Sequence, residues 1–327
     1  MRAAVTISVA GVAARRGSSG GAQGGRAAFT LVELLVSMVI LAILAALSLA
    51  GLAGVRQRAK AEKTRNTIRK IDAVIRPMYD SYRTRRLLDL QTQPDRFLAS
   101  AQLLEAKRRL ISYEMPDRWE DVPVPAAAMK NATGSAAVPP GMRTAAVRSY
   151  AAARPASPNT LYGGAECLYL VVQRSGYDPD ALEFFRTDEI GDLDKDGLPE
   201  FLDGWGRPIA FLRWAPGFSS PVQVNDPLNA HDPLDPRRID DSAYALVPLI
   251  YSSGPDGATA LPTDDQLGYG LADFDRSNPN TKVWTDPNKS MMQLLGRAVT
   301  PNGLVGAPLP NSDEALDNIT NHDLLKK

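Results

Sequence analysis

The chain has 327 residues, of which 37 are basic and 37 acidic, so its formal net charge is zero and no global positive field favours nucleic-acid binding. Its single cysteine excludes an intramolecular disulfide framework and a cysteine-cluster zinc site, and its two histidines argue against a histidine-based catalytic or metal centre. No phosphate-binding glycine loop, zinc-protease motif or hydrolase nucleophile motif occurs, so we expect no enzymatic activity.

The first element in chain order is an apolar run over residues 29–55 that contains one charged residue, Glu33. A helix of 24 residues spans about 36 Å, enough to cross the hydrocarbon core of a bilayer. The run is longer than the apolar region of a secretory signal, and basic residues follow it at once. We therefore expect a transmembrane helix, in which Glu33 either reaches the interface or is neutralised by a partner.

After the span, apolar residues recur at spacings of three and four with charged residues between them. They are Ile68, Ile71, Ile75, Met78 and Tyr82. This pattern predicts an amphipathic continuation of the helix over 56–82, whose apolar face packs against a globular head. Pro77 lies inside the pattern and should kink the helix or end it nearby.

Residues 83–190 are expected to be a helical, Ala/Pro-rich insertion. We predict a helix over 95–111 and a shorter one over 165–174, with Cys167 buried in the latter. The apolar side of the first helix is expected to comprise Phe97, Leu98, Leu103, Leu104 and Leu110. Residues 121–160 lack apolar periodicity and are expected to form a surface loop.

Residues 191–327 contain short apolar runs separated by turn residues. The runs at 207–214, 243–252 and 282–284 are typical of strands in an antiparallel meander. The expected fold class is therefore α+β, with a long N-terminal helix packed on a globular head that contains further helices and a small antiparallel sheet.

Carboxylates at alternate positions surround a glycine in the stretch 192–203. Such spacing can direct several oxygens at one hard cation, as an EF-hand loop does, so we expect a Ca²⁺ site here. The candidate ligands are Asp192, Asp194, Asp196, Glu200 and Asp203. The match to an EF-hand is partial, because position twelve is an aspartate and Pro199 removes a backbone donor. The alternative is a solvated acidic turn.

The string Arg26-Ala27-Ala28-Phe29-Thr30-Leu31-Val32-Glu33, followed by about twenty apolar residues, resembles the N-terminal signal of type IV prepilins and type II secretion pseudopilins. The resemblance implies that a prepilin peptidase cleaves between Ala28 and Phe29 and N-methylates Phe29. It also implies that Glu33, fifth in the mature chain, pairs with the terminal amine of a neighbouring subunit. Ala28 departs from the glycine that usually precedes the cut.

Cleavage would remove residues 1–28 as a leader that contains four arginines and no acid. Subtracting 28 from 327 leaves 299 residues, with 33 basic and 37 acidic groups. The neutral balance of the whole chain would thus become mildly acidic in the mature subunit.

Two shorter stretches resemble the head of the major pseudopilin. They are DGWGRPI at 203–209 and SGPDG at 253–257. By this resemblance Asp256 marks a turn before a second calcium loop, to which Asp264 or Asp265 would supply oxygens.

The resemblance implies a pseudopilin-like structural subunit, single-pass in the inner membrane with its head on the periplasmic side. It would assemble through its N-terminal helix with identical or related pilin-like subunits and inner-membrane secretion or pilus assembly proteins, forming a fibre for type II-like protein secretion. A type IV pilin for adhesion, motility or DNA uptake is the alternative within the superfamily. A non-polymerising single-pass membrane protein with a ligand-binding head is the alternative outside it.

Overall fold

A computed structural model describes residues 30–87, 95–124, 138–158, 161–241, 243–258 and 316–325, except for the side chains of Ala50 and Leu98. The chain divides into two compact units, with the boundary between Ala53 and Gly54. Helix α1, Leu31–Ser81, begins in the first unit and ends in the second. The long N-terminal helix is confirmed, and it ends soon after Pro77, which lies inside it.

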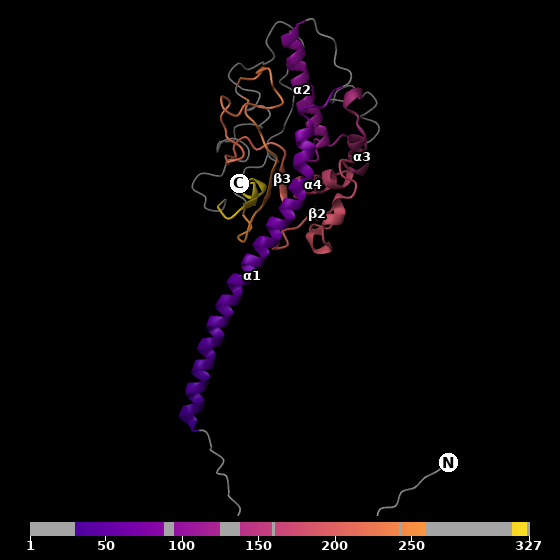
Figure 1. Cartoon of the computed structure of the whole chain (residues 1–327). Helices are drawn as coiled ribbons and strands as arrows, with labels where there is room; N and C mark the ends of the chain where they lie inside the picture. The colour runs from indigo at the N-terminus through magenta and orange to yellow at the C-terminus, as the bar shows by residue number, and fades with distance from the viewer. Residues whose placement is uncertain are drawn as a thin grey trace, which may run out of the picture. The chain divides into compact units, whose positions relative to one another are not determined.

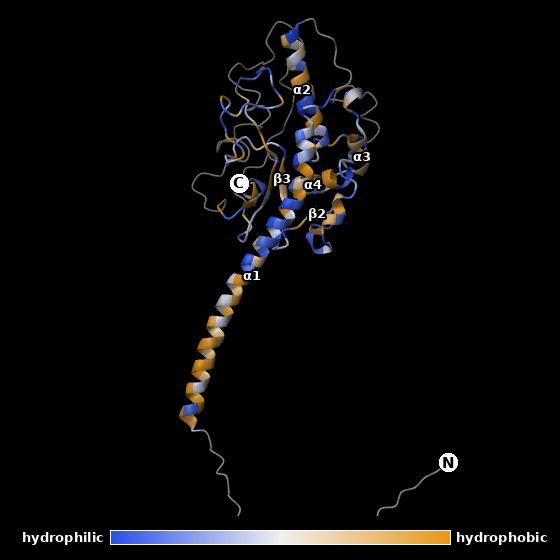
Figure 2. Cartoon of the chain, viewed as in Figure 1, coloured by the Kyte–Doolittle hydropathy of each residue, from blue (hydrophilic) through white to orange (hydrophobic). Residues whose placement is uncertain are grey.

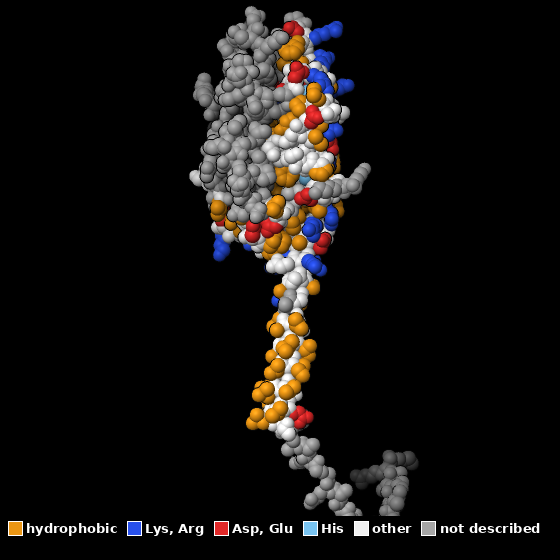
Figure 3. Space-filling model, turned by 90° about the vertical axis from the view of Figure 1, so that its left-hand side faces the viewer, with side chains coloured by type: hydrophobic (Ala, Val, Ile, Leu, Met, Phe, Trp, Pro, Cys, Tyr) orange, Lys and Arg blue, Asp and Glu red, His pale blue; other side chains and the backbone are white. Residues whose placement is uncertain are grey.

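The described part of the first unit, residues 30–53, contains the apolar part of α1 (Figure 2). Its described side chains are exposed, and Figure 3 shows hydrophobic groups over the visible face of this segment. The helix is long and apolar enough to cross a membrane. Exposure of so much apolar surface to water is unfavourable, so this segment requires lipid or other protein around it.

In the second unit, the predicted apolar face of α1 forms part of the core. Ile68, Ile71 and Ile75 are fully buried. Three further helices contribute side chains to the same hydrophobic cluster. They are α2 (Arg96–Glu114), α3 (Ala145–Ala153) and α4 (Gly163–Arg174), all labelled in Figure 1. Because these helices share one core with α1, the segment after α1 is an integral part of the second unit.

Two small antiparallel sheets complete the second unit. In the first, β1 (Ile190–Gly191) pairs with β2 (Glu200–Phe201). The second has the order β3-β4-β5, formed by Ala210–Leu212, Leu249–Ser252 and Ile319–Thr320. Short 3₁₀ helices precede the sheets: η2 (Pro140–Met142), η3 (Ala181–Phe184) and η4 (Thr187–Glu189). The α+β fold class is confirmed.

The C-terminal segment is held on the second sheet by a short helix, α6 (Asn321–Leu324), which follows β5. His322 is fully buried there: its Nδ1 lies 2.9 Å from Ser220 Oγ and its Nε2 lies 3.3 Å from the carbonyl oxygen of Pro248. Since a carbonyl only accepts, Nε2 carries the proton and Nδ1 accepts from the hydroxyl. Burial lowers the pKa of His322 to about 4 and keeps the ring neutral at physiological pH.

Two expectations about the helices were wrong. Part of the expected loop over 121–160 is helix α3, which Thr144 caps by accepting a hydrogen bond from Val147 N at 3.4 Å. In α2, Phe97 and Leu103 are exposed. The inward face of α2 instead carries Arg108, which is buried and bound to Asp232 at 2.6 Å.

The other apolar positions of α2 agree with expectation in part: Leu104 and Leu110 are buried, whereas the side chain of Leu98 lies outside the described residues. Helix α4 and the burial of Cys167 are confirmed. The expected strands at 207–214 and 243–252 contain β3 and β4, and the run at 282–284 lies outside the described residues.

Candidate functional site

The N-terminal end of α1 places one carboxylate in an apolar helix. Thr30 caps the helix, since its Oγ1 accepts a hydrogen bond from Glu33 N at 3.2 Å. The two serine hydroxyls of the segment are satisfied within the helix, because Ser37 donates to the carbonyl of Glu33 (2.7 Å) and Ser48 to that of Leu44 (2.8 Å). The Glu33 carboxylate is exposed and has no ion-pair partner among the described residues. Glu33 is therefore the charged group of this segment that requires an external partner in lipid.

The sequence-predicted cleavage residues, Ala28 and Phe29, lie outside the described residues. Their processing is thus inferred from the sequence motif alone.

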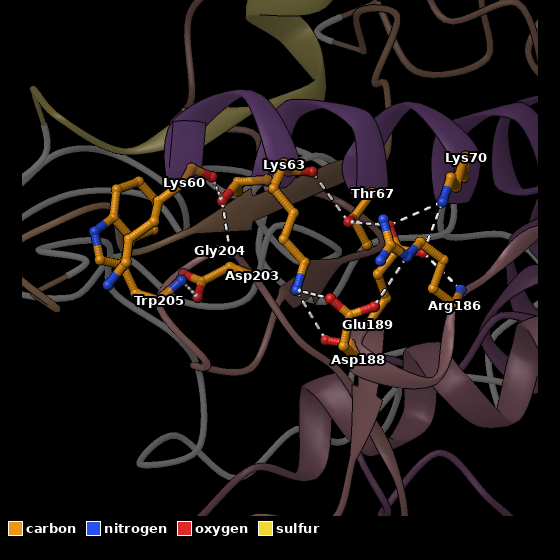
Figure 4. Close-up of polar contacts among 11 residues, drawn as sticks. Lys60, Lys63, Thr67, Lys70, Arg186, Asp188, Glu189, Asp203, Gly204 and Trp205 are labelled. Carbon is orange, nitrogen blue, oxygen red and sulfur yellow. Dashed lines mark hydrogen bonds and ion pairs between the residues drawn. The ribbon is translucent and has the colours of Figure 1, made fainter. Parts of the chain in front are cut away.

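The head holds the amphipathic part of α1 through a polar cluster around Glu189 (Figure 4). Lys70 Nζ lies 2.6 and 2.8 Å from the two carboxylate oxygens, and Thr67 Oγ1 donates to one of them at 2.8 Å. The backbone N–H of Arg186 donates to the other at 2.7 Å. Burial by itself would raise the pKa of Glu189, but these donors outweigh it and the pKa is lowered. Glu189 is therefore ionised and bonded on both oxygens.

A second contact with α1 comes from the turn after β2, where Gly204 faces the helix backbone. Gly204 N donates to Thr64 Oγ1 at 2.9 Å, and the indole N–H of Trp205 donates to Gln57 Oε1 at 2.8 Å. A Cβ on Gly204 would lie 2.1 Å from the carbonyl oxygen of Lys60. Only glycine allows the turn to approach α1 this closely.

Asp203, one of the predicted metal ligands, organises this turn. Its Oδ1 accepts from the backbone N–H groups of Trp205 (2.8 Å) and Arg207 (2.9 Å), and its Oδ2 accepts from the Ser252 hydroxyl (2.7 Å). It lies outside the groups of carboxylates that converge in the preceding loop. Because both carboxylate oxygens of Asp203 already accept hydrogen bonds from the protein, this residue holds the turn together in the structure.

The other four predicted ligands do lie close together. One carboxylate oxygen from each of Asp192, Asp194 and Glu200 falls within a set whose members are all within 4.8 Å of one another. A second such set contains Asp194, Asp196 and an unpredicted member, Glu166 of α4. The loop carboxylates also accept hydrogen bonds from the backbone of their own loop: Gly197 N donates to Asp192 at 3.0 Å.

Glu166 and Glu200 form the buried side of this cluster, with 1% and 0% exposure. Burial, together with the neighbouring carboxylates of the loop, raises the pKa of both carboxyls to about 7. Sequence reasoning missed Glu166 because an acid on the apolar face of a helix has no motif. Its place beside Cys167, in an otherwise apolar run, was the available signal.

The second predicted calcium turn is described only in part. Asp256 accepts a hydrogen bond from Ala258 N at 2.9 Å, and Arg207 donates to the carbonyl of Gly254 at 2.7 Å. Asp264 and Asp265 lie outside the described residues, so the proposed ligand set remains a prediction.

Residues 24–49 match the family described as the prokaryotic N-terminal methylation motif. The match includes the predicted cleavage position and Glu33. The chain therefore carries a prepilin-type signal, which supports a membrane-anchored structural subunit of the pilin-like kind and implies processing by a prepilin peptidase and assembly with pilin-like subunits. No curated protein and no solved structure matches the chain.

Proposed function

We propose that the chain is a pseudopilin-like structural subunit that works in type II-like protein secretion. In this proposal it is inserted in the inner membrane with its head in the periplasm, cleaved between Ala28 and Phe29, and N-methylated on Phe29. It then assembles through its N-terminal helix into a fibre, together with related pilin-like subunits and inner-membrane assembly proteins.

The observation that carries the proposal is the position of Glu33 within the methylation motif. It is the only charge in the apolar part of α1, and the nearby hydroxyls do not reach its carboxylate. The terminal ammonium of a neighbouring processed subunit would neutralise it in a low-dielectric setting. Such a contact joins different surfaces of the two subunits, which is the kind of interface that builds an open fibre when its rotation does not close into a ring.

The packing of the head supports assembly through the helix. The contacts of Glu189 and Gly204 bind the head along the amphipathic part of α1, where they engage three residues, Thr64, Thr67 and Lys70. Axial packing of helices would therefore set the spacing of the heads as well.

Secretion is favoured over a type IV pilus by the two pseudopilin-like stretches, because they contact each other. Arg207 of the first donates to the Gly254 and Pro255 carbonyls of the second, at 2.7 and 3.4 Å. Ser252 also donates to Asp203. The two stretches thus act as one structural element, which supports their joint resemblance to a pseudopilin head.

Assembly is tested by replacing Glu33 with glutamine and comparing it with Ser37→Ala, whose hydroxyl bonds only within its own helix. Removal of one member of a buried ion pair costs about 3–5 kcal/mol, a loss of 10²-fold or more in association. We expect the E33Q chain to be processed yet absent from chemically cross-linked multimers, whereas S37A forms them normally. Wild-type levels of multimers in E33Q would contradict the proposal.

The secretion role is tested by deleting the chain in its host and analysing both the culture supernatant and sheared surface fibres. We expect exported proteins to accumulate in the periplasm while surface fibres persist. Loss of surface fibres with normal export would instead identify a type IV pilin.

A further inference from the structure

A group of five carboxylates gathers where the loop between β1 and β2 crosses the N-terminal part of α4. Three belong to the loop: Asp192, Asp194 and Asp196. The other two come from regular elements, Glu200 from β2 and Glu166 from α4. Within each of the two three-residue sets the oxygens lie within 4.8 Å of one another, and Asp194 belongs to both sets.

The two buried acids are incompletely satisfied by the protein. Glu166 accepts from the indole N–H of Trp119 on Oε2, and Glu200 accepts from Leu193 N on Oε2 at 3.2 Å. The Oε1 atom of each is buried without a hydrogen-bond partner among the described residues. A buried carboxylate oxygen left in this state costs free energy that a bound cation would recover.

No basic side chain supplies this compensation to the buried pair. Within the described part of the chain, neither Glu166 nor Glu200 has an ion-pair partner. Buried acids elsewhere in the same unit do, as Glu189 has Lys70 and Asp232 has Arg108. The cluster therefore differs from the ion pairs of the core, in that no basic side chain among the described residues balances its two buried acids.

We propose that Asp192, Asp194, Asp196, Glu200 and Glu166 bind one Ca²⁺ ion. All donors are oxygens, which favours a hard cation over zinc or copper. Ligands on opposite sides of Ca²⁺ are about 5 Å apart, since each bond is about 2.3–2.6 Å, and the spacing of the oxygens within each set fits that span. Mg²⁺ takes shorter bonds and keeps several waters, so a cluster of five carboxylates suits it less.

The proposed ion would join three separate elements of the head. It would tie the loop to β2 through Glu200 and to α4 through Glu166, and so link the small sheet to the helical core. The site does not depend on the proposed secretion role, because it uses only residues of the head.

The test uses the full chain in detergent, freed of metal with a chelator and then titrated with CaCl₂ or with MgCl₂. We expect one Ca²⁺ per chain by calorimetry, with a dissociation constant of about 10⁻⁴–10⁻³ M, the range of extracellular calcium modules. At a free Ca²⁺ concentration ten times that dissociation constant, the folding equilibrium constant should rise about 11-fold, and the melting temperature should rise as well. Tb³⁺ in place of Ca²⁺ should luminesce on tryptophan excitation, because Trp119 contacts Glu166.

Three variants and one control localise the ion. Glu200→Gln and Glu166→Gln should lose the calcium-dependent shift, yet be at least as stable as the wild type in chelator, since each removes a buried negative charge. Asp196→Asn should also lose the shift, and because the residue is exposed and asparagine keeps an oxygen that can accept from Leu198 N, we expect little change in folding. Glu183→Gln, an exposed acid outside the cluster, should keep it. A wild type that shows no shift with Ca²⁺, or a shift that persists in E200Q and D196N, would overturn the proposal.

Discussion

Replacing Gly204 with alanine should destabilise the second unit, because this residue lies against the backbone of α1. The new Cβ would lie 2.1 Å from the carbonyl oxygen of Lys60 and 2.7 and 2.8 Å from its carbonyl carbon and Cα. A helix backbone cannot yield as a side chain does, so the turn must move away and lose its 2.9 Å hydrogen bond to Thr64. Overpacking costs about 1–3 kcal/mol and the lost hydrogen bond about 1 kcal/mol, which gives about 3 kcal/mol together.

Thermal unfolding of the full chain in detergent, followed by tryptophan fluorescence, measures this loss. For a unit of this size 1 kcal/mol corresponds to roughly 2–4 °C, so we expect Gly204→Ala to melt about 6–12 °C below the wild type. Gly206→Ala is the matched control, because its Cβ would meet nothing within 4 Å. Its only expected cost is about 1–2 kcal/mol of backbone strain, which arises from its φ of +80°. If G204A melts within a degree of the wild type, or no lower than G206A, the close approach to α1 is wrong.

Two further changes test the head. Glu189→Gln should lower the free energy of unfolding by about 2 kcal/mol in chemical denaturation, because Lys70 loses its charged partner. The control Glu62→Gln, from an exposed ion pair, should lower it by less than about 0.5 kcal/mol. Equal losses in the two variants would refute the assigned contact. Because the pKa of His322 is lowered from 6.5 to about 4 on folding, the neutral ring makes its full contribution to the free energy of unfolding above pH 6.5. That contribution, about 3 kcal/mol, is lost as the pH falls from 6.5 to about 4. The stability gap between wild type and His322→Gln should therefore shrink over that range in urea titrations, and a constant gap would contradict the buried neutral ring.

Local pattern was sufficient for the elements that carry their own periodicity. The spacing of Ile68, Ile71 and Ile75 predicted both the continuation of α1 and the face that it buries. The same reasoning located α4, because its apolar residues recur at helical spacing. In each case the signal lies within one helix and needs no knowledge of the partner.

Helix α3 was missed because alanine is a strong helix former but contributes little to an apolar pattern. Its buried face has two large side chains, Val147 and Tyr150, which are too few to establish a period. The cap at Thr144 was the remaining signal, and a single threonine before an alanine run is weak evidence by itself.

The contacts that bind the head to α1 could not be read from sequence, because they join residues far apart in the chain. Lys70 and Glu189 are 119 positions apart, and Thr64 and Gly204 are 140 apart. The same limit hid β5, which pairs with β4 from near the C-terminus. In the acidic loop, spacing predicted four members of the cluster, but Glu166 approaches from a different helix and Asp203 turns away to bond the next turn.

Intact mass spectrometry of the chain purified from membranes tests the central claim most directly. The account predicts a mature chain that begins at Phe29, lacks the 28 leader residues and carries one additional methyl group on its terminal amine. A functional protein that retains the full 35.3 kDa mass, or one that begins at any other residue, would contradict it.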